Sequence, residues 1–255
     1  MLPIALNGAT KLIQYFKWAS TKTYLFTIQF GIKTNTGDIT GTIVDKSDII
    51  PDIDSINKVL PKFRGELEQT PHVFSAVKIN GKKSYELARK GIIPDIKPKQ
   101  VIINSLNVLK QISNDKYMFE ANVSSGTYIR SLSEDIALSL GTVGCTTYLR
   151  RTSIGKFNVG IPLDYLPNIV HNVSKIVISA EDLLDGIPVV HVSDEVAYNL
   201  SLGKSIPVDD QSVINNNDLL YLVKSPDGFL ELVTLHDGYM HPKKLIRKLG
   251  GKDVD

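Results

Sequence analysis

The sequence predicts an α+β fold, because its strands follow one another too often for a regular βαβ chain. Two segments, Lys22–Thr34 and Tyr117–Val123, alternate large apolar residues with other residues, which is the pattern of half-buried strands. A third segment, Ile129–Leu140, repeats its apolar residues at helical spacing. The chain has 255 residues, 42% apolar and 22% charged, so it resembles a globular protein and can bury a sizeable core.

The segments after the first strand contain a further strand and a helix. Glycines at positions 37 and 41 punctuate the chain, and Thr40–Val44 is predicted as a strand. Ile53–Phe63 has helical spacing, with Asp52 or Asp54 available as the N-cap.

The middle of the chain alternates short helices with longer strands. Ser84–Lys90 is predicted as a short helix that Gly91 stops, and Val101–Ile112 as the strand that follows. Thr127 is a candidate cap for the helix that begins at Ile129.

The character of the sequence changes between Asp164 and Pro188. Ser179-x-x-Asp182 indicates the start of a short helix, and Val189–Leu235 contains short runs typical of strands. We therefore expect two domains, residues 1–175 and a small β-rich domain of residues 176–255.

Several classes of protein are excluded by composition. No apolar stretch approaches the roughly 18 residues of a membrane span, and the N-terminus lacks the pattern of a secretory signal. The single cysteine, Cys145, permits no internal disulfide, which favours a reducing, cytoplasmic location. The five histidines are scattered, and neither a phosphate-binding glycine loop nor zinc-ligand spacing is present, so we expect no metal site. A monomer is the default expectation.

Charge is distributed unevenly along the chain. Lys58–Lys99 contains ten basic and four acidic residues, a local net charge of +6, whereas Asn35–Asn57 has five acidic residues against one lysine, or −4. A second basic cluster near the C-terminus contains Lys243, Lys244, Arg247, Lys248 and Lys252. Such surfaces suit phosphate contact, although the counts alone are equally typical of a solvated lysine-rich surface.

Three segments carry a family resemblance. The central segment runs from Phe63-Arg64-Gly65-Glu66 through Thr70-Pro71 and Ser75-Ala76-Val77-Lys78 to Ala88-Arg89-x-Gly91. The second consists of Ser125-Gly126-Thr127-Tyr128-Ile129-Arg130 and Tyr148-Leu149-Arg150-Arg151-Thr152, and the third is Leu2–Lys11. Together and in this order, they resemble TruB-type tRNA pseudouridine synthases. His72-Val73-Phe74 departs from that family's usual proline and tyrosine.

The resemblance implies a pseudouridine synthase fold, with a mixed, largely antiparallel sheet flanked by helices and a PUA-like C-terminal RNA-binding domain. It also implies an isomerase, an intramolecular transferase that converts the uridine at position 55 in the T loop of tRNA to pseudouridine without a metal or cofactor. The partner would be the tRNA T arm, whose target base must be flipped out of its stack.

The resemblance also assigns roles to individual residues. Arg130 matches the arginine that pairs with the family's catalytic aspartate, although most surface arginines are simply solvated. Tyr24 matches the active-site tyrosine, and Tyr128 and Leu149 match residues that line the uridine pocket, but all three could equally serve in packing. The expected phosphate-contacting residues are Lys78, Lys82, Lys83 and Arg89.

One element of the family pattern is not found in the sequence. In the family, a Gly-x-x-Asp-Pro loop directly precedes the Leu-Pro-Ile segment, so the nucleophilic aspartate is expected about six residues before Met1. Asp38, Asp45 and Asp135 do not lie in a matching loop. The first hypothesis is an enzyme that begins further upstream, so that the chain as written is an inactive, truncated form. The alternatives are a short protein that binds or helps fold tRNA and, less favoured, an α+β protein unrelated to RNA.

Overall fold

The computed structural model describes residues 2–15, 21–155, 157–158, 160, 177–184, 186–208, 219–247 and 250. The chain forms two compact units. The first contains residues 18–160 with Met1–Leu2, and the second contains residues 161–255 with Pro3–Lys17. The boundary predicted at residue 175 falls outside the described residues and stays a prediction.

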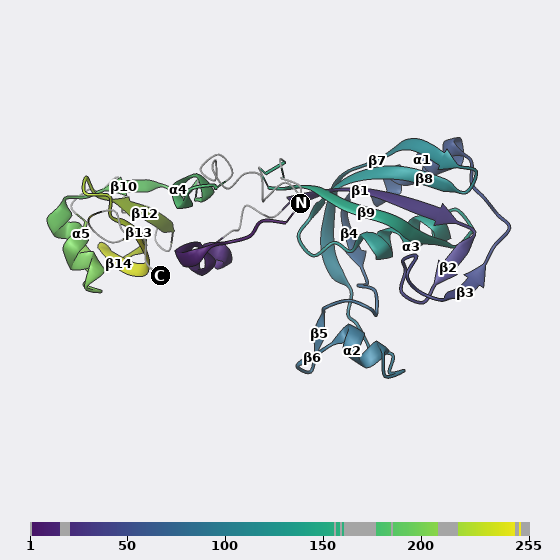
Figure 1. The fold of residues 1–255 in the computed structure, drawn as a ribbon, viewed down its shortest axis with the longest axis horizontal. Coiled ribbons are helices and arrows are strands. Elements are labelled where there is room, and N and C mark those ends of the chain that lie inside the picture. Colours follow the sequence, from purple (N-terminus) through teal and green to yellow (C-terminus); the bar gives the residue numbers. More distant parts are fainter. Residues whose placement is uncertain are drawn as a thin grey trace, which may run out of the picture. The chain divides into compact units, whose positions relative to one another are not determined.

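An antiparallel sheet of five strands forms the centre of the first unit (Figure 1). In spatial order the strands are β4 (Gly65–Gln69), β7 (Lys99–Ser113), β8 (Lys116–Ser124), β1 (Thr21–Phe30) and β9 (Gly144–Ile154). Buried and partly exposed side chains alternate along the whole of β8, as its sequence pattern predicts. The α+β class is confirmed.

The core lies on the face of this sheet that α3 (Ile129–Ser139) covers. Leu132 and Ile136 are fully buried in one cluster with the strand residues Phe26 and Phe119, whose rings stack with centroids 5.4 Å apart. The helix contacts β9 and β1. Its amphipathic spacing therefore fixes which side of the helix turns toward the sheet.

The strand predicted over Lys22–Thr34 is divided at Gly31. Gly31 has a φ of +87°, a conformation that favours glycine, and beyond it the chain leaves the central sheet. There β2 (Ile32–Thr34) pairs with β3 (Ile43–Lys46) in a two-stranded ribbon.

The strand predicted from Thr40 begins three residues later than expected, at Ile43. The Thr40 N–H donates to the carboxylate of Asp38 at 3.1 Å, and the Gly41 N–H donates to the Asp38 carbonyl at 3.2 Å. These bonds make a turn of residues that β-propensity alone would extend.

Local capping explains the helix starts in part. In α1 (Ile53–Val59), the predicted cap Asp52 accepts the Ser55 N–H at 2.7 Å. The helix continues as the short 3₁₀ segment η2 (Leu60–Phe63), which contains Pro61. The Thr127 cap was wrong, because Tyr128 is the N-cap of α3 and the Thr127 hydroxyl donates to the Ser124 carbonyl instead.

A small basic insertion, residues 70–98, separates β4 from β7. It contains the hairpin β5 (Lys78–Ile79) and β6 (Lys82–Lys83) and the helix α2 (Ser84–Ala88), and Figure 1 shows these elements projecting from the body of the unit. Asn80 and Gly81 have φ values of +49° and +81°, as an Asn-Gly hairpin turn requires. The Ser84 and Tyr85 N–H groups donate to the carbonyls of Val77 and Ser75, which attaches α2 to the base of the insertion.

The second unit is β-rich. Its sheet has the order β10 (Val189–His191), β12 (Leu220–Lys224), β13 (Leu230–His236), β14 (Tyr239–Arg247) and β11 (Ile206–Pro207), in which only β10 and β12 run parallel among the described pairs. The predicted start of α4 (Ala180–Leu183) is confirmed, since the Asp182 N–H donates to the Ser179 hydroxyl at 3.0 Å.

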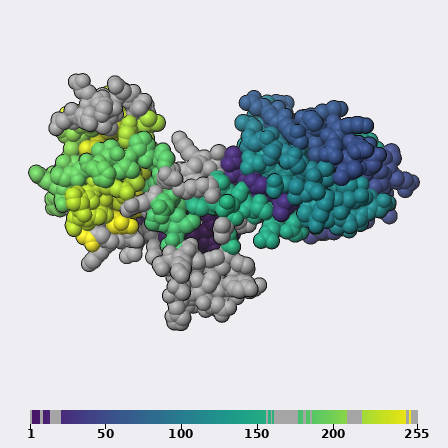
Figure 2. Space-filling model, turned by 90° about the horizontal axis from the view of Figure 1, so that it is seen from above, coloured from purple at the N-terminus to yellow at the C-terminus, as the bar shows by residue number. Residues whose placement is uncertain are grey.

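Two apolar clusters stabilise this sheet. One includes Ala197 and Leu200 of α5 (Asp194–Ser201), and the other joins Leu184 to Leu12 of the 3₁₀ helix η1 (Asn7–Tyr15). In Figure 2, the green and yellow atoms of α5 and these strands lie together in one body. No helix among the described residues is long and apolar enough to span a bilayer.

A buried carboxyl in β13 predicts how stability of the second unit changes with pH. Glu231 is 4% exposed, its Oε2 atom has no hydrogen-bond partner in the described part of the chain, and burial raises its pKa to about 7. Glu231 therefore favours folding below the ordinary glutamate pKa, and this contribution is lost as pH rises through about 7.

We expect Glu231→Gln to raise the opening free energy of the Leu232 and Val233 amides, measured by hydrogen exchange, by on the order of 2–3 kcal/mol at pH 8. The increase should be much smaller at pH 5. The exposed Glu195→Gln serves as the control and should give the same change at both pH values. An equal effect of Glu231→Gln at both pH values would contradict the burial argument.

Candidate active site

Arg130, the second residue of α3, binds three carbonyl or carboxylate acceptors from other segments. Its Nη1 donates to the Thr36 carbonyl and to Oδ2 of Asp38, both at 3.0 Å. Its Nη2 donates to the Phe74 carbonyl at 2.9 Å. A guanidinium has five N–H donors, so this arrangement fixes its plane and leaves donors for another acceptor.

Asp38 is held as an anion in the turn that follows β2. Its Oδ1 accepts the Thr36 hydroxyl at 2.9 Å as well as the backbone N–H and hydroxyl of Thr40. Burial would raise the pKa of Asp38, but the bonds from Thr40 and Thr36 and the charge of Arg130 outweigh it and lower the pKa below its ordinary value. The carboxylate therefore stays ionised and anchors Arg130.

A buried amide fixes the start of α3. The Gln69 side chain accepts the Tyr128 N–H at 2.7 Å and donates to the Tyr128 carbonyl at 3.1 Å, so it binds that residue as a neighbouring strand would. The Ser131 hydroxyl donates to the Thr70 carbonyl at 3.0 Å. The end of β4 thus sets the position from which Arg130 extends.

A hollow of about 330 Å³ opens beside Arg130. Its lining residues come from the Asp38 turn, α3 and β9: Asp38, Ile39, Arg130, Thr146, Thr147, Tyr148 and Leu149. The side chains of Ile39 and Leu149 are about half exposed. The structure thus brings two predicted residues, Arg130 and Leu149, together in a volume at the lower end of the range for small-molecule sites.

The two predicted tyrosines are placed differently. Tyr24 lies on β1 opposite Arg151 and Ala121, partly buried against the core, and is not among the residues that line the hollow. Tyr128 is the N-cap residue that Gln69 holds, and it is also absent from the lining.

The predicted phosphate-contacting residues all lie in the insertion. Lys78 pairs with Lys83 and Ile79 with Lys82 across the hairpin. The cations of Lys83 and Arg89 lie 5.5 and 5.3 Å from the centroid of the Tyr85 ring, so both side chains are held against it.

The C-terminal basic cluster is only partly described. Lys243, Lys244 and Arg247 lie on β14, whereas Lys248 and Lys252 fall outside the described residues.

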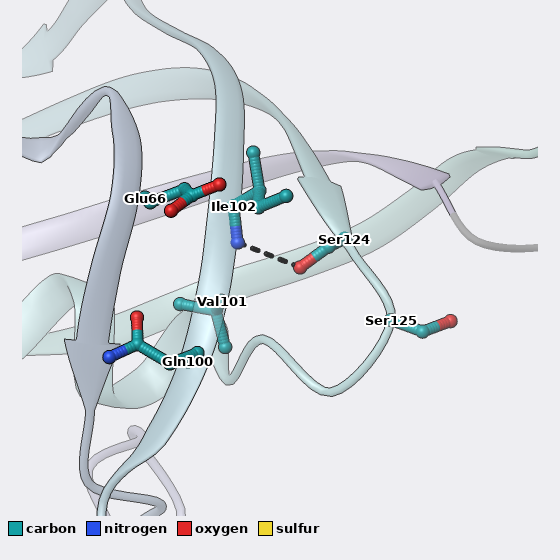
Figure 3. Close-up of a pocket in the computed structure, with 6 residues that line it drawn as sticks. All are labelled: Glu66, Gln100, Val101, Ile102, Ser124 and Ser125. Atoms are coloured by element: carbon teal, nitrogen blue, oxygen red, sulfur yellow. Dashed lines mark hydrogen bonds between the residues drawn. The ribbon is translucent and has the colours of Figure 1, made fainter.

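Other features of the described chain carry no comparable chemistry. No group of three His, Cys, Asp or Glu residues there could hold a metal ion. Cys145 is fully buried, and burial raises the pKa of its thiol to about 11, so it does not supply a thiolate. A second hollow, shown in Figure 3, lies between the ends of β4, β7 and β8 and has Glu66 as its only titratable lining residue.

Comparison with known proteins identifies the family. Residues 1–129 match the family described as "TruB family pseudouridylate synthase (N terminal domain)". A tRNA pseudouridine synthase B from Caulobacter sp. (strain K31) is 32% identical over 257 aligned positions, which cover 97% of this chain and 83% of the relative. The chain belongs to the TruB family. A relative of the same name from Bradyrhizobium diazoefficiens is 33% identical, covering 98% of this chain and 74% of its own length.

Solved structures support the fold. The chain resembles one from a Cbf5-Nop10-Gar1 complex with a TM-score of 0.64 and 21% identity, covering 99% of this chain and 74% of the other. A chain from an H/ACA RNP bound to a substrate RNA gives a TM-score of 0.61 at 18% identity, covering 94% and 70%. The pseudouridine synthase fold predicted for this TruB-family chain is thus confirmed.

Two residues of the arrangement were missed by sequence reasoning. Asp38 does not lie in a loop that matches the family's catalytic loop and has no role in the sequence-based prediction, but the turn brings it to Arg130. Gln69 lies in the central TruB signature and was given no role. Gln69 is 2% exposed, and the sequence gives no signal for this burial, because the strand that ends at Gln69 was not predicted.

The Gln69 contact predicts a measurable loss of stability in the first unit. Gln69→Leu preserves approximate volume but removes the acceptor of the Tyr128 N–H, while the Tyr128 carbonyl still accepts the Leu132 N–H. This should cost about 1–3 kcal/mol in urea unfolding of that unit. Gln111→Leu, at an exposed position of β7, should change the free energy of unfolding by less than about 0.5 kcal/mol. Similar values for the two variants would show that the Gln69 amide contributes nothing specific.

Proposed function

We propose that this protein, when it carries the family's carboxylate loop ahead of Leu2, converts the T-loop uridine of tRNA, position 55, to pseudouridine, acting as a cytoplasmic monomer without a metal or cofactor. The observation that carries the proposal is the Arg130 guanidinium, fixed by Thr36, Asp38 and Phe74 beside a hollow that Leu149 also lines. The similarity of the chain to a tRNA pseudouridine synthase B over 97% of its length supports tRNA as the substrate class.

Arg130 would keep the catalytic carboxylate ionised. A carboxylate that attacks or deprotonates at a glycosidic bond must remain ionised in a partly desolvated pocket, and an adjacent cation lowers its pKa. Because Asp38 already binds Thr36, Thr40 and Arg130, we assign it to holding the guanidinium rather than to attack.

The target base must enter the hollow from a flipped position, since it cannot be reached inside the stacked loop. In this proposal Leu149 contacts the uracil, and Tyr24 and Tyr128, which the structure does not include in the lining of the hollow, approach it when RNA is bound. Binding energy from the tRNA T arm would compensate for the cost of unstacking.

The basic insertion supports the assignment of an RNA backbone contact. Lys78 and Lys83 are directly opposite each other in the hairpin, an arrangement that destabilises a strand pair through like-charge repulsion. A phosphate between or beside the two ammonium groups would neutralise this repulsion. Shape and backbone contacts of this kind are typical of RNA recognition.

The reaction also needs the family's carboxylate, and residues 1–255 contain no Gly-x-x-Asp-Pro loop. We therefore propose that residues 1–255 alone bind tRNA without modifying it, and that a chain with this loop ahead of Leu2 is active. Enzyme-dependent pseudouridine in a T-arm substrate treated with residues 1–255, detected by mass spectrometry, would refute this part.

Arg130 provides the sharpest test of the chemistry. In a chain that carries the loop, Arg130→Ala should lower kcat by about 10²–10³-fold, because the carboxylate loses the cation beside it, while the Kd for tRNA changes little. Arg130→Lys keeps the charge but cannot bind all three acceptors, and should also be impaired. Equal losses in kcat and in tRNA affinity would instead indicate a phosphate-binding arginine.

Salt dependence tests the insertion. Charge reversal at Lys82 and Lys83 should weaken tRNA binding by residues 1–255. It should also reduce the magnitude of the slope of log K against log salt concentration by about two, because the counterions of two phosphates are no longer released on binding. The control is charge reversal at Lys62 and Lys110, which are exposed and lie outside the insertion. Both proteins must be folded monomers, since aggregates bind RNA without specificity. An unchanged slope in the Lys82 and Lys83 variant would remove the insertion from the RNA-binding surface.

A further inference from the structure

Arg130 has a potential ion-pair partner that it does not use. Glu134 lies four residues later on α3, at the spacing at which arginine and glutamate commonly pair on a helix. Arg130 instead binds Thr36, Asp38 and Phe74. Oε1 of Glu134 is buried and has no hydrogen-bond partner within the described residues, so the carboxyl is held away from the nearest arginine on its own helix.

His72 lies next to the Glu134 carboxyl and explains why this carboxyl does not pair with Arg130. Its side chain is 9% exposed, and Nε2 lies 3.8 Å from Oε1 of Glu134. Nδ1 accepts the Phe74 N–H at 3.1 Å, so the proton of the neutral ring lies on Nε2, the nitrogen nearest to Glu134. The ring also packs closely on the Asp38 turn, since a Cβ atom on Gly37 would lie 3.1 Å from its Cδ2.

Burial favours the uncharged form of both His72 and Glu134. Burial and then the cations Arg130 and Lys33 lower the pKa of His72 to about 4, although Asp38 acts in the opposite direction. Burial raises the pKa of Glu134, and Asp135 adds to this effect, whereas Lys33 and Arg130 oppose it. A carboxyl in such surroundings would be drawn to Arg130 if it were free to turn and ionise.

We propose that His72 is a positioning residue that holds the Glu134 carboxyl away from Arg130 and so reserves the guanidinium for the acceptors that aim it into the hollow. His72 contacts each part of the arrangement: the Gly37 turn, the Phe74 backbone whose carbonyl binds Arg130, and Glu134 on α3. Only its effect on turnover rests on the proposed function.

The test separates contact with Glu134 from support of the backbone. His72→Asn keeps an acceptor that can bind the N–H two residues ahead, as Asn does in turns, but its side chain is too short to reach Glu134. His72→Gln retains an amide long enough for Glu134. The guanidinium signals of Arg130 in ¹H–¹⁵N spectra of residues 1–255, assigned with Arg130→Lys, report its hydrogen bonds directly.

We expect His72→Asn to shift the Arg130 signals and speed exchange of its guanidinium protons about tenfold, while His72→Gln stays near wild type. Adding Glu134→Gln to His72→Asn should restore the wild-type signals, because the competing carboxylate is gone. Glu134→Gln alone should leave them unchanged. Unchanged signals in His72→Asn, or a double variant no better than His72→Asn, would overturn the proposal.

Turnover gives the second readout. In a chain carrying the carboxylate loop, His72→Asn should lower kcat about tenfold at unchanged tRNA affinity, and Glu134→Gln in the same chain should recover it. If the Arg130 signals respond as expected but kcat does not, the inference about His72 stands and the catalytic role proposed for Arg130 fails.

Discussion

The arrangement around Arg130 depends on one constraint: a partly buried guanidinium must be surrounded by acceptors, since an unpaired charge is costly to remove from water. Two segments distant in sequence from α3 supply them, namely the turn after β2 and the base of the insertion. The break at Gly31 directs the chain into the ribbon that carries the Asp38 turn. The Gln69 amide sets where α3 begins. These local features of the first unit therefore act together to position the Arg130 side chain.

Much of the fold is predictable from local sequence. The alternation in β8 and the helical spacing in α3 each extend over enough residues for the period to decide the element. The errors arise where a contact from elsewhere outweighs local preference. Thr127 has the chemistry of a cap, but its hydroxyl donates to Ser124, and Gln69, 59 residues earlier than Tyr128, holds the start of α3 instead.

The candidate site divides in the same way. Motif order identifies Arg130 and Leu149, and the structure places both at one hollow. Sequence alone could not assign Asp38, because its importance comes from a bond to a residue 92 positions away. His72 was visible only as a departure from the family pattern, and its neighbours Gly37 and Glu134 are close to it only after folding. Periodicity reports burial, whereas these side chains matter through their partners.

The insertion between β4 and β7 consists of two parts with different freedom to change. Gln69 and Lys99, which flank it, are directly paired in the sheet, so the whole excursion begins and ends at one rung of the ladder. Its first residues are tied to α3 through Thr70 and Phe74, whereas its hairpin and α2 are bonded mainly to the insertion's own backbone. The tip can therefore change in length and charge without disturbing the bonds to α3, whereas the base is constrained by the geometry of the arginine. The tip and the base of the insertion therefore meet at a structural boundary near Val77, whose carbonyl accepts the Ser84 N–H.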